Sequence, residues 1–336
     1  MELTIKEKIL KLLSNYPEGI LQSNIYRALN VSKSRVSEVL KDLEYSGLVV
    51  RVRVGNQYVV KSRVHVGSVL RGRVVRLGIV WSSEYPFITP FIKLLKDRLG
   101  FEVSVTVYTN AITATSALVR NEVDLALTPL ITQLYAYSLT KSLRILGGGV
   151  YGGSAVMVSQ SSTNDEVLCS EFSTMDLCRL LAINEGLIDT STTKYFSNPL
   201  TDLLPNIKYR KFKYVVVWHP LTEYLRMHNY KYVVSCSDLG IKYCCTLAST
   251  TAIDSDLRSK ISEIYQIALE EYSRDPSKWV EWYSALVGIS PDLIVKSVNE
   301  YKLQPYIDLG LIREALSKAR LGIPDINSLL NAFEFK

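Results

Sequence analysis

The stretch GGGVYGGSAVMVS at residues 147–159 decides whether the α/β fold is a dinucleotide-binding one or consists of two lobes joined by a crossing. Gly147, Gly149 and Gly152 match the G-x-G-x-x-G spacing of the dinucleotide-binding fingerprint. In that fingerprint the glycines open a helix, and the helix N-terminus holds a pyrophosphate. Here the glycines are followed by SAVMVS, an apolar run that is typical of a strand. We therefore expect no dinucleotide site, and we interpret the glycines as a sharp crossing between two lobes.

Strand-then-helix units lie on both sides of this stretch. Apolar periodicity predicts strands at residues 74–81, 101–108, 123–128, 143–146, 167–169, 213–218 and 241–247. It predicts helices at residues 87–99, 114–121, 173–183 and 254–273, and from 276 to the end. Such alternation predicts an α/β fold with a mostly parallel, doubly wound sheet and ligands at the carboxyl ends of the strands.

Four segments of this region carry a resemblance. NEVDLALTPL (residues 121–130) resembles the g-x-x-D-x-A-x-x-p segment of type-2 periplasmic-binding proteins, and VVVWHPLTEYL (215–225) and YCCTLAST (243–250) resemble their second-lobe and return segments. The tail at residues 274–312 is similar to the nitrate-, sulfonate- and taurine-binding proteins and to the thiamine-pyrimidine-synthase-like superfamily. The resemblance covers about residues 73–330. It implies a two-lobed, periplasmic-binding-protein-like domain that holds a small molecule between its lobes.

The positive charge of the chain is concentrated at its beginning. Residues 1–72 contain 12 basic and 6 acidic side chains, whereas residues 73–336 contain 27 of each, so the entire net charge of +6 lies in the first part. This asymmetry is typical of a small polyanion-binding module joined to a larger neutral domain. A basic helical appendage without a partner is the alternative.

The same N-terminal part has its own pattern of elements. Apolar stripes predict helices at residues 5–13 and 21–29 and a third helix capped by Ser32, and Gly55-Asn56 predicts the turn of a β-hairpin after residue 47. This order, over residues 3–60, resembles the winged helix-turn-helix regulators of the MarR and TrmB type. The resemblance implies binding of double-stranded DNA, with the third helix in the major groove and the hairpin on the backbone. The DNA-contacting residues expected on this basis are Ser32, Lys33, Ser34, Arg35, Ser37, Lys41, Arg51, Arg53 and Asn56.

These patterns predict a domain organisation for the whole chain. Residues 1–62 form the winged helix, 63–72 a linker, and 73–336 the two-lobed domain. Lobe 1 comprises about 73–150 and 238–336, and lobe 2 about 151–237. Because one such module reads only a few base pairs, DNA recognition implies a homodimer.

In a two-lobed domain the ligand contacts strand ends and helix N-termini in the cleft. The expected ligand-binding residues are Trp81, Ser82, Ser83, Thr109, Asn110, Thr128, Gly152, Gly153, Ser154, Ser173, Thr174, Trp218 and His219. For each Ser or Thr, a helix cap or turn is the alternative role. His219 also admits a catalytic interpretation, because a histidine is a versatile acid or base near neutral pH.

Composition narrows the remaining classes of protein. The chain has 336 residues, of which 47% are hydrophobic, and it contains no apolar run of the length that a membrane-spanning helix requires. It begins MELTIKEKILKLL, without the long apolar core of a signal peptide, so we expect it in the cytosol and not at a membrane. Five cysteines without a CxxC pair are interpreted as reduced thiols, and the adjacent Cys244 and Cys245 are expected to face opposite sides of a strand. With only three histidines, we expect no metal site and no cofactor.

Together these features favour a cytoplasmic, ligand-responsive transcription regulator. Its DNA-binding winged helix would be controlled by a small, polar or anionic effector bound between the lobes. The alternative is an enzyme of the pyrimidine-synthase-like fold that uses His219 and whose winged helix serves dimerisation.

Overall fold

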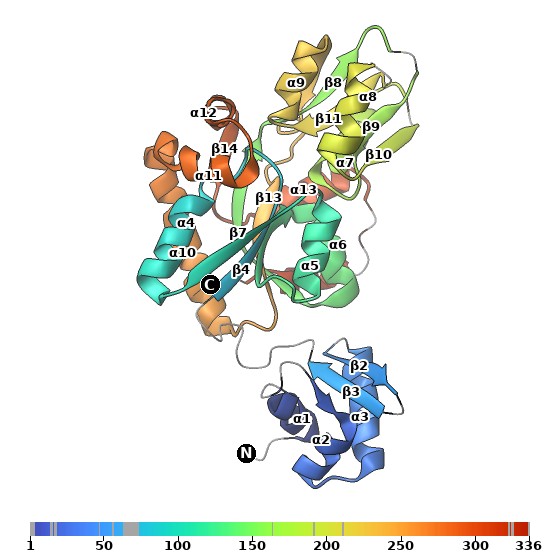
Figure 1. The fold of residues 1–336 in the computed structure, drawn as a ribbon. Coiled ribbons are helices and arrows are strands. Elements are labelled where there is room, and N and C mark those ends of the chain that lie inside the picture. Colours follow the sequence, from blue (N-terminus) through green and yellow to red (C-terminus); the bar gives the residue numbers. More distant parts are fainter. Residues whose placement is uncertain are drawn as a thin grey trace. The chain divides into compact units, whose positions relative to one another are not determined.

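We analysed a computed structural model of the chain, which describes residues 4–13, 16, 19–46, 48–55, 57–62, 74–162, 164–190, 192–209, 212–321, 323 and 326–334. The chain divides into two compact units, Met1–Val74 and Val75–Lys336, and each is described by itself (Figure 1). The linker predicted at residues 63–72 lies outside the described residues. Among the described helices, none combines the length and the apolar character needed to cross a membrane.

The first unit contains three helices and a small antiparallel sheet. The elements are α1 (Ile5–Leu13), β1 (Ile20–Leu21), α2 (Gln22–Leu29), α3 (Lys33–Tyr45), β2 (Val49–Val54) and β3 (Gln57–Ser62), with the strand order β1-β3-β2. The three predicted helices and the hairpin are confirmed. Strand β1 was not predicted, because two residues are too few to show a period.

The predicted apolar stripe of α3 forms the centre of the first core. Its four residues, Val36, Val39, Leu40 and Leu43, are buried against residues of the other two helices and the sheet. The Ser32 hydroxyl caps α3 by accepting a hydrogen bond from the backbone N–H of Arg35 at 3.4 Å, as predicted.

The second unit has two mixed sheets, one in each lobe. Lobe 1 contains the six-stranded sheet, with the order β14-β7-β13-β6-β4-β5. These strands are β4 (Val74–Val80), β5 (Glu102–Tyr108), β6 (Leu125–Pro129), β7 (Leu143–Gly152), β13 (Cys245–Thr250) and β14 (Tyr301–Gln304). Strand β13 runs antiparallel to β6 and β7, so the prediction of a mostly parallel sheet is wrong and the lobe has a mixed one.

Helices cover both faces of this sheet. Helices α4 (Ile88–Leu99) and α10 (Ser255–Arg274) lie together on one side, and α5 (Ala111–Val119) and α6 (Leu130–Thr140) lie on the other (Figure 1). Phe91 of α4 packs edge-on against Tyr265 of α10, with ring centroids 5.3 Å apart. The tail after α10 was predicted as helix throughout, but it is broken. Its elements are η2 (Pro276–Trp279), α11 (Val280–Val287), α12 (Pro291–Val298), β14, α13 (Leu309–Lys318) and η3 (Ile326–Ala332).

Lobe 2 contains the five-stranded sheet, with the order β10-β9-β11-β8-β12. Its strands are β8 (Ser154–Ser159), β9 (Val167–Ser170), β10 (Thr193–Phe196), β11 (Tyr214–Trp218) and β12 (Tyr230–Ser235). Its helices are α7 (Thr174–Asn184), η1 (Pro199–Leu203), α8 (Leu204–Lys208) and α9 (Leu221–Met227). Strand β8 pairs antiparallel with both β11 and β12, whereas β9 is parallel to β10 and β11.

The chain crosses between the lobes at the glycines singled out in the sequence. Gly152 and Gly153, with φ of +91° and +63°, connect β7 of lobe 1 directly to β8 of lobe 2. A strand, not a helix, follows the glycines, so the expectation that they form a crossing and open no dinucleotide-binding helix is confirmed. The chain returns from β12 to β13, and β13 begins at Cys245, four residues later than predicted.

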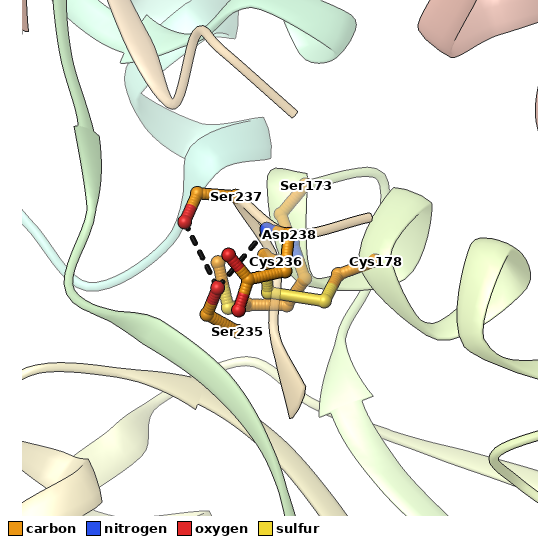
Figure 2. Close-up of a disulfide and its surroundings, with 7 residues drawn as sticks. Ser173, Cys178, Ser235, Cys236, Ser237 and Asp238 are labelled. Carbon is orange, nitrogen blue, oxygen red and sulfur yellow. Dashed lines mark hydrogen bonds between the residues drawn. A yellow bond between two sulfur atoms is a disulfide. The ribbon is translucent and has the colours of Figure 1, made fainter. Parts of the chain in front are cut away.

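A disulfide bond within lobe 2 joins Cys178 of α7 to Cys236, the residue after β12 (Figure 2). The bridge holds the start of the return segment against the helix, and the hydroxyls of Ser235 and Ser237 are hydrogen-bonded beside it at 2.9 Å. The prediction that all five cysteines are reduced is therefore wrong for this pair. The other three cysteines are free and buried.

Candidate functional site

A cavity of about 30 Å³ lies between the two lobes, and we refer to it as the interlobe cavity. This volume has room for only a few water molecules. The cavity is lined by Val80, Ser82, Glu84, Tyr85, Ala111 and Pro129 from lobe 1, by Ser170, Ser173, Thr174, Met175 and Trp218 from lobe 2, and by Cys244 and Cys245 from the return segment. Four of the predicted ligand-binding residues are in this set: Ser82, Ser173, Thr174 and Trp218.

The N-terminus of α7 forms the lobe 2 side of the cavity. Ser173 caps this helix: its hydroxyl accepts from the backbone N–H of Met175 at 3.1 Å and donates to the carbonyl of Ser170 at 2.7 Å. The hydroxyl of Thr174 donates to the carbonyl of Cys244 at 3.1 Å, and so joins the second lobe to the return segment. A helix N-terminus favours negative charge, so this side of the cavity suits an anionic or polar group.

Three titratable side chains meet at the lobe 1 side of the cavity. The carboxylate of Glu84 and the sulfurs of Cys244 and Cys245 all lie within 4.8 Å of one another, and all three residues are buried. We refer to them as the thiol–carboxylate cluster. The two sulfurs are 4.0 Å apart, and the hydroxyl of Tyr85 donates to the Cys245 sulfur at 2.8 Å.

Burial and mutual hydrogen bonds shift the pKa values of this cluster. Burial, followed by the proximity of Cys244, raises the pKa of Glu84 well above its ordinary value, which favours the neutral carboxyl group. The pKa of Cys244 is lowered, chiefly because the Cys245 thiol donates a hydrogen bond to it. Burial raises the pKa of Cys245. Among the thiols of the cluster, Cys244 is thus the one that ionises first.

The cluster corrects an expectation from the sequence. Cys244 and Cys245 were expected to face opposite sides of one strand and therefore to be unable to share a ligand. Only Cys245 belongs to β13, and Cys244 lies in the turn before it, where the alternation of a strand does not apply. Their side chains consequently converge.

A second group of predicted residues lies in a different pocket, outside the interlobe cavity. Gly152, Gly153, Ser154 and His219 line a pocket of about 220 Å³ together with Arg226 and other residues of lobe 2 and the tail. His219 is 2% exposed. Burial lowers the pKa of His219 to about 4, so the ring is neutral at pH 7.

Ser83 connects this pocket to the loop after β4. Its hydroxyl donates to the carbonyl of His219 at 2.9 Å and lies 3.1 Å from Nδ1 of the ring. The hydroxyl of Tyr301 is 3.3 Å from the hydroxyl oxygen of Ser83. Ser83 therefore holds His219 in place, and both residues lie apart from the lining of the interlobe cavity.

Three of the remaining four predicted ligand residues are engaged in internal hydrogen bonds, and the fourth is exposed. Asn110 caps α5, accepting from the backbone N–H of Thr113 at 2.8 Å, and Thr109 beside it is exposed. Thr128 is fully buried and accepts a hydrogen bond from Thr115 at 3.0 Å. Trp81 donates from its indole nitrogen to the carbonyl of Val287 at 2.9 Å. None of these four predicted residues is among the lining residues of the interlobe cavity.

In the first unit, the predicted DNA-contacting residues differ in their exposure to solvent. Ser32, Lys33, Ser34, Arg35 and Lys41 of the third helix and its cap are exposed, and Ser37 is half-buried. Asn56 lies outside the described residues.

Two of the predicted arginines are paired with acids of the same unit. Arg35 pairs with Glu38 at 2.7 Å. Arg51 is half-buried, and its Nε donates to Glu44 at 2.9 Å. Arg53 is exposed and donates to the carbonyl of Gly55 at 3.2 Å.

Glu84 and Tyr85 were missed by the sequence analysis, although both follow a predicted strand. The sequence carries no signal for either residue, because an acid in the loop between residues 74–81 and 87–99 is ordinarily exposed, and the cluster around Glu84 forms only through distant segments of the chain.

Comparison with protein-family models finds a match in the first unit. A family model described as a domain of unknown function, DUF7343, matches residues 2–63. A comparison with curated protein sequences finds no match.

Solved structures resemble the chain over about three quarters of its length. The ligand-binding component of an ABC-type import system from Staphylococcus aureus, with zinc bound, has a TM-score of 0.62 and 14% identity, and covers 74% of this chain and 91% of its own. The alkanesulfonate-binding protein SsuA from Xanthomonas axonopodis pv. citri, bound to MOPS, has a TM-score of 0.63 and 14% identity, covering 78% and 98%. The periplasmic aliphatic sulphonate binding protein SsuA from Escherichia coli has a TM-score of 0.59 and 12% identity, covering 74% and 91%. The second unit therefore has a periplasmic-binding-protein-like α/β fold with two mixed sheets.

Proposed function

We propose that the chain is a DNA-binding transcription regulator that responds to a small molecule. The observation that carries the proposal is the confinement of the whole net charge of +6 to residues 1–72, a segment whose described part folds as a separate unit of three helices and a hairpin. A cationic unit attached to a neutral one suits a polyanionic partner.

The arrangement of the first unit supports a winged helix-turn-helix. Only three residues, Asn30, Val31 and Ser32, separate α2 from α3, and Asn30 takes the left-handed conformation with φ of 51°. A turn of this length between two packed helices is the pattern in which the second helix enters the major groove. The hairpin of β2 and β3 would then serve as the wing.

The exposed lysines of α3 are the best candidates for contacts with phosphate. Helix α3 carries three basic and three acidic side chains, and Arg35 is paired with Glu38. Lys33 and Lys41 are exposed, and within the described part of the first unit neither forms an ion pair with an acid of this helix, although the ammonium group of Lys33 lies 5.4 Å from the centre of the Tyr26 ring. We therefore assign the main electrostatic contribution of the helix to these two lysines.

The interlobe cavity supports the sensing half of the proposal. The structural neighbours include proteins that bind sulfonates, which suggests a small, polar or anionic ligand for this chain too. Because the cavity has room for only a few waters, a metabolite could enter only if the lobes move apart. A ligand that favours one lobe arrangement shifts the population of the two, and a coupling of about 1–3 kcal/mol changes DNA affinity several-fold to a hundredfold.

Two further parts of the proposal follow from DNA recognition. A homodimer would present two copies of α3 to two half-sites, and a cytoplasmic location would bring the chain to DNA. A sensor is favoured over an enzyme because His219, the one candidate acid or base of the sequence analysis, is held by Ser83 outside the lining of the interlobe cavity.

Salt-dependent binding of the full-length chain to a fluorescent duplex from the upstream region of its own gene tests the proposal. Removal of one lysine that neutralises a phosphate should reduce the slope of log affinity against log salt by about 0.9, so Lys33→Ala/Lys41→Ala should reduce it by about 2. The matched control is Lys93→Ala/Lys260→Ala, which removes two exposed lysines of the second unit.

The control should retain the affinity and salt slope of the wild type. An equal decrease of affinity in both double variants, or no binding by the wild type at low salt, would refute DNA recognition by α3. Thermal shifts with a panel of small organic sulfonates and carboxylates, compared between wild type and Ser173→Ala, test the sensing half separately.

A further inference from the structure

The thiol–carboxylate cluster combines donors from two distant segments in one buried place. Glu84 follows β4, whereas Cys244 and Cys245 lie 160 residues later, at the end of the return segment from lobe 2. Their exposed fractions are 3%, 5% and 3%. A carboxyl group is costly to bury without strong partners, so the burial of Glu84 against two thiols needs a physical reason.

A second, independent observation points to a ligand at the cluster. Oε1 of Glu84 is buried and has no hydrogen-bond partner among the described residues. Buried polar atoms without a partner are rare in native proteins, and each one indicates an unassigned role or an unseen ligand. Glu84 lines the interlobe cavity together with both cysteines, so this oxygen belongs to a group with space beside it.

The spacing of the donors fits a tetrahedral metal ion. Two sulfur ligands of zinc, each about 2.3 Å from the metal, are about 3.8 Å apart in a tetrahedral site. The sulfurs of Cys244 and Cys245 are 4.0 Å apart. A carboxylate oxygen belongs about 3.5 Å from each sulfur in such a site, and the three donors here lie within 4.8 Å of one another. A modest movement of the Glu84 side chain would therefore complete the coordination.

We propose that Glu84, Cys244 and Cys245 bind one borderline-soft divalent cation of the zinc class. Two thiolates favour zinc-class metals over Mg²⁺ or Ca²⁺, which prefer oxygen ligands alone. Three protein ligands leave a fourth position, and the interlobe cavity, which all three residues line, would lie beside it. That position would be open to water or to a donor atom of a small molecule.

Neighbouring groups support the proposed ligands. The hydroxyl of Tyr85 donates to the Cys245 sulfur at 2.8 Å, and the backbone N–H of Cys244 donates to the carbonyl of Val150 at 3.0 Å. Contacts of this kind, made by groups that do not themselves bind the metal, hold its ligands in their orientation. The proposal goes beyond the proposed function and does not rest on it, because a metal could bind whether or not the first unit recognises DNA.

Cobalt(II) titration of the full-length chain, purified with its free thiols reduced, tests the site. We expect one equivalent of Co²⁺ to produce the near-ultraviolet charge-transfer absorption of thiolate ligands, and one equivalent of Zn²⁺ to remove it. Cys244→Ser and Cys245→Ser should each lower this absorption by about half, and Glu84→Gln should weaken Co²⁺ binding about tenfold or more. The matched control is Cys169→Ser, which removes a buried free thiol of lobe 2 outside the cluster.

Three results would overturn the proposal: no stoichiometric absorption when alkylation shows both thiols free, an equal loss in Cys169→Ser, or a disulfide between Cys244 and Cys245 in peptides from the untreated protein. If a serine variant fails to fold, the nearly isosteric Glu84→Gln carries the test. Native mass spectrometry should then find one zinc per wild-type chain and less in this variant. Failure of DNA binding leaves all of these readouts unchanged.

Discussion

His219 should make the stability of the second unit depend on pH. Burial lowers the pKa of this ring to about 4, a shift to which nearby Glu223 and Arg226 contribute in opposite directions. The pKa of a histidine in an unfolded chain is about 6.5. The unfolded chain therefore binds the proton first as the pH falls, and the contribution of neutral His219 to stability, present above about 6.5, is lost between there and about 4.

The size of the effect follows from the two pKa values. The full loss is about 3 kcal/mol, because each pKa unit corresponds to about 1.4 kcal/mol. Between pH 7 and pH 5 the linkage relation gives a loss of about 2 kcal/mol. His219→Gln, which keeps a neutral group able to hydrogen-bond to Ser83, should lack this part of the pH dependence while other titrating groups remain.

Urea unfolding followed by tryptophan fluorescence measures this difference. All four tryptophans, at positions 81, 218, 279 and 282, lie in the second unit, so the signal reports on that unit alone. When the pH is lowered from 7 to 5, the free energy of unfolding should decrease by about 2 kcal/mol more in the wild type than in His219→Gln. Equal decreases in both proteins would show that His219 is protonated readily in the folded state, and the argument from its burial would be refuted.

Three other changes test packing in the second unit. Gly149→Ala would place a methyl group 2.2 Å from a carbonyl oxygen of β13 and should lower the free energy of unfolding by about 3 kcal/mol or more. Gly186→Ala, at a φ of +72° and with no atom within 4 Å, should lower it by about 1 kcal/mol. If thermal unfolding shows Gly186→Ala to be the more destabilising of the two, the register of β7 and β13 is contradicted. Gln133 is fully buried and donates to a carbonyl of β13 at 2.8 Å, so Gln133→Leu should lower the free energy of unfolding by about 1–3 kcal/mol, and a neutral result in urea would exclude this network. Cys178→Ala/Cys236→Ala opens a bridge across a sequence separation of 58 and should cost about 4 kcal/mol; an unchanged Tm in non-reducing buffer would mean that the bridge does not form.

Local periodicity was sufficient to predict most of the elements. The stripe of Val36, Val39, Leu40 and Leu43 identified α3 because these residues recur at helical spacing and all face one core. The run at Ser154–Ser159 identified β8, and with it the crossing at the glycines, because four consecutive apolar residues between serines are too few for a helix and are typical of a buried strand. Signals of this kind depend only on neighbours along the chain.

Features that depend on distant partners could not be predicted in the same way. Strand β14 is short and polar, and its partner β7 lies about 150 residues earlier, so it shows no apolar alternation of its own. The partner of Cys178 is Cys236, and the sequence contains no spacing rule that selects this pair from five cysteines. The prediction of reduced thiols relied on the odd number of cysteines, the lack of a CxxC pair and the expected cytosolic location, none of which gives the distance between two cysteines in the fold.

The candidate site was found only in part because it depends on where two lobes meet. Ser173 and Thr174 could be predicted from the capping preference at the start of a helix. Glu84 could not, since its role depends on Cys244, which is brought to it by the return of the chain from lobe 2.

The carbonyl of Cys244 shows why this position matters physically. It accepts one hydrogen bond from the backbone N–H of Leu130 in lobe 1 at 3.0 Å and another from the hydroxyl of Thr174 in lobe 2 at 3.1 Å. Separation of the lobes would break the second bond and leave the first, so the residue that carries one of the proposed metal ligands also senses the lobe arrangement. We therefore expect occupancy of the cluster and separation of the lobes to be thermodynamically linked, each changing the equilibrium of the other by the same free energy.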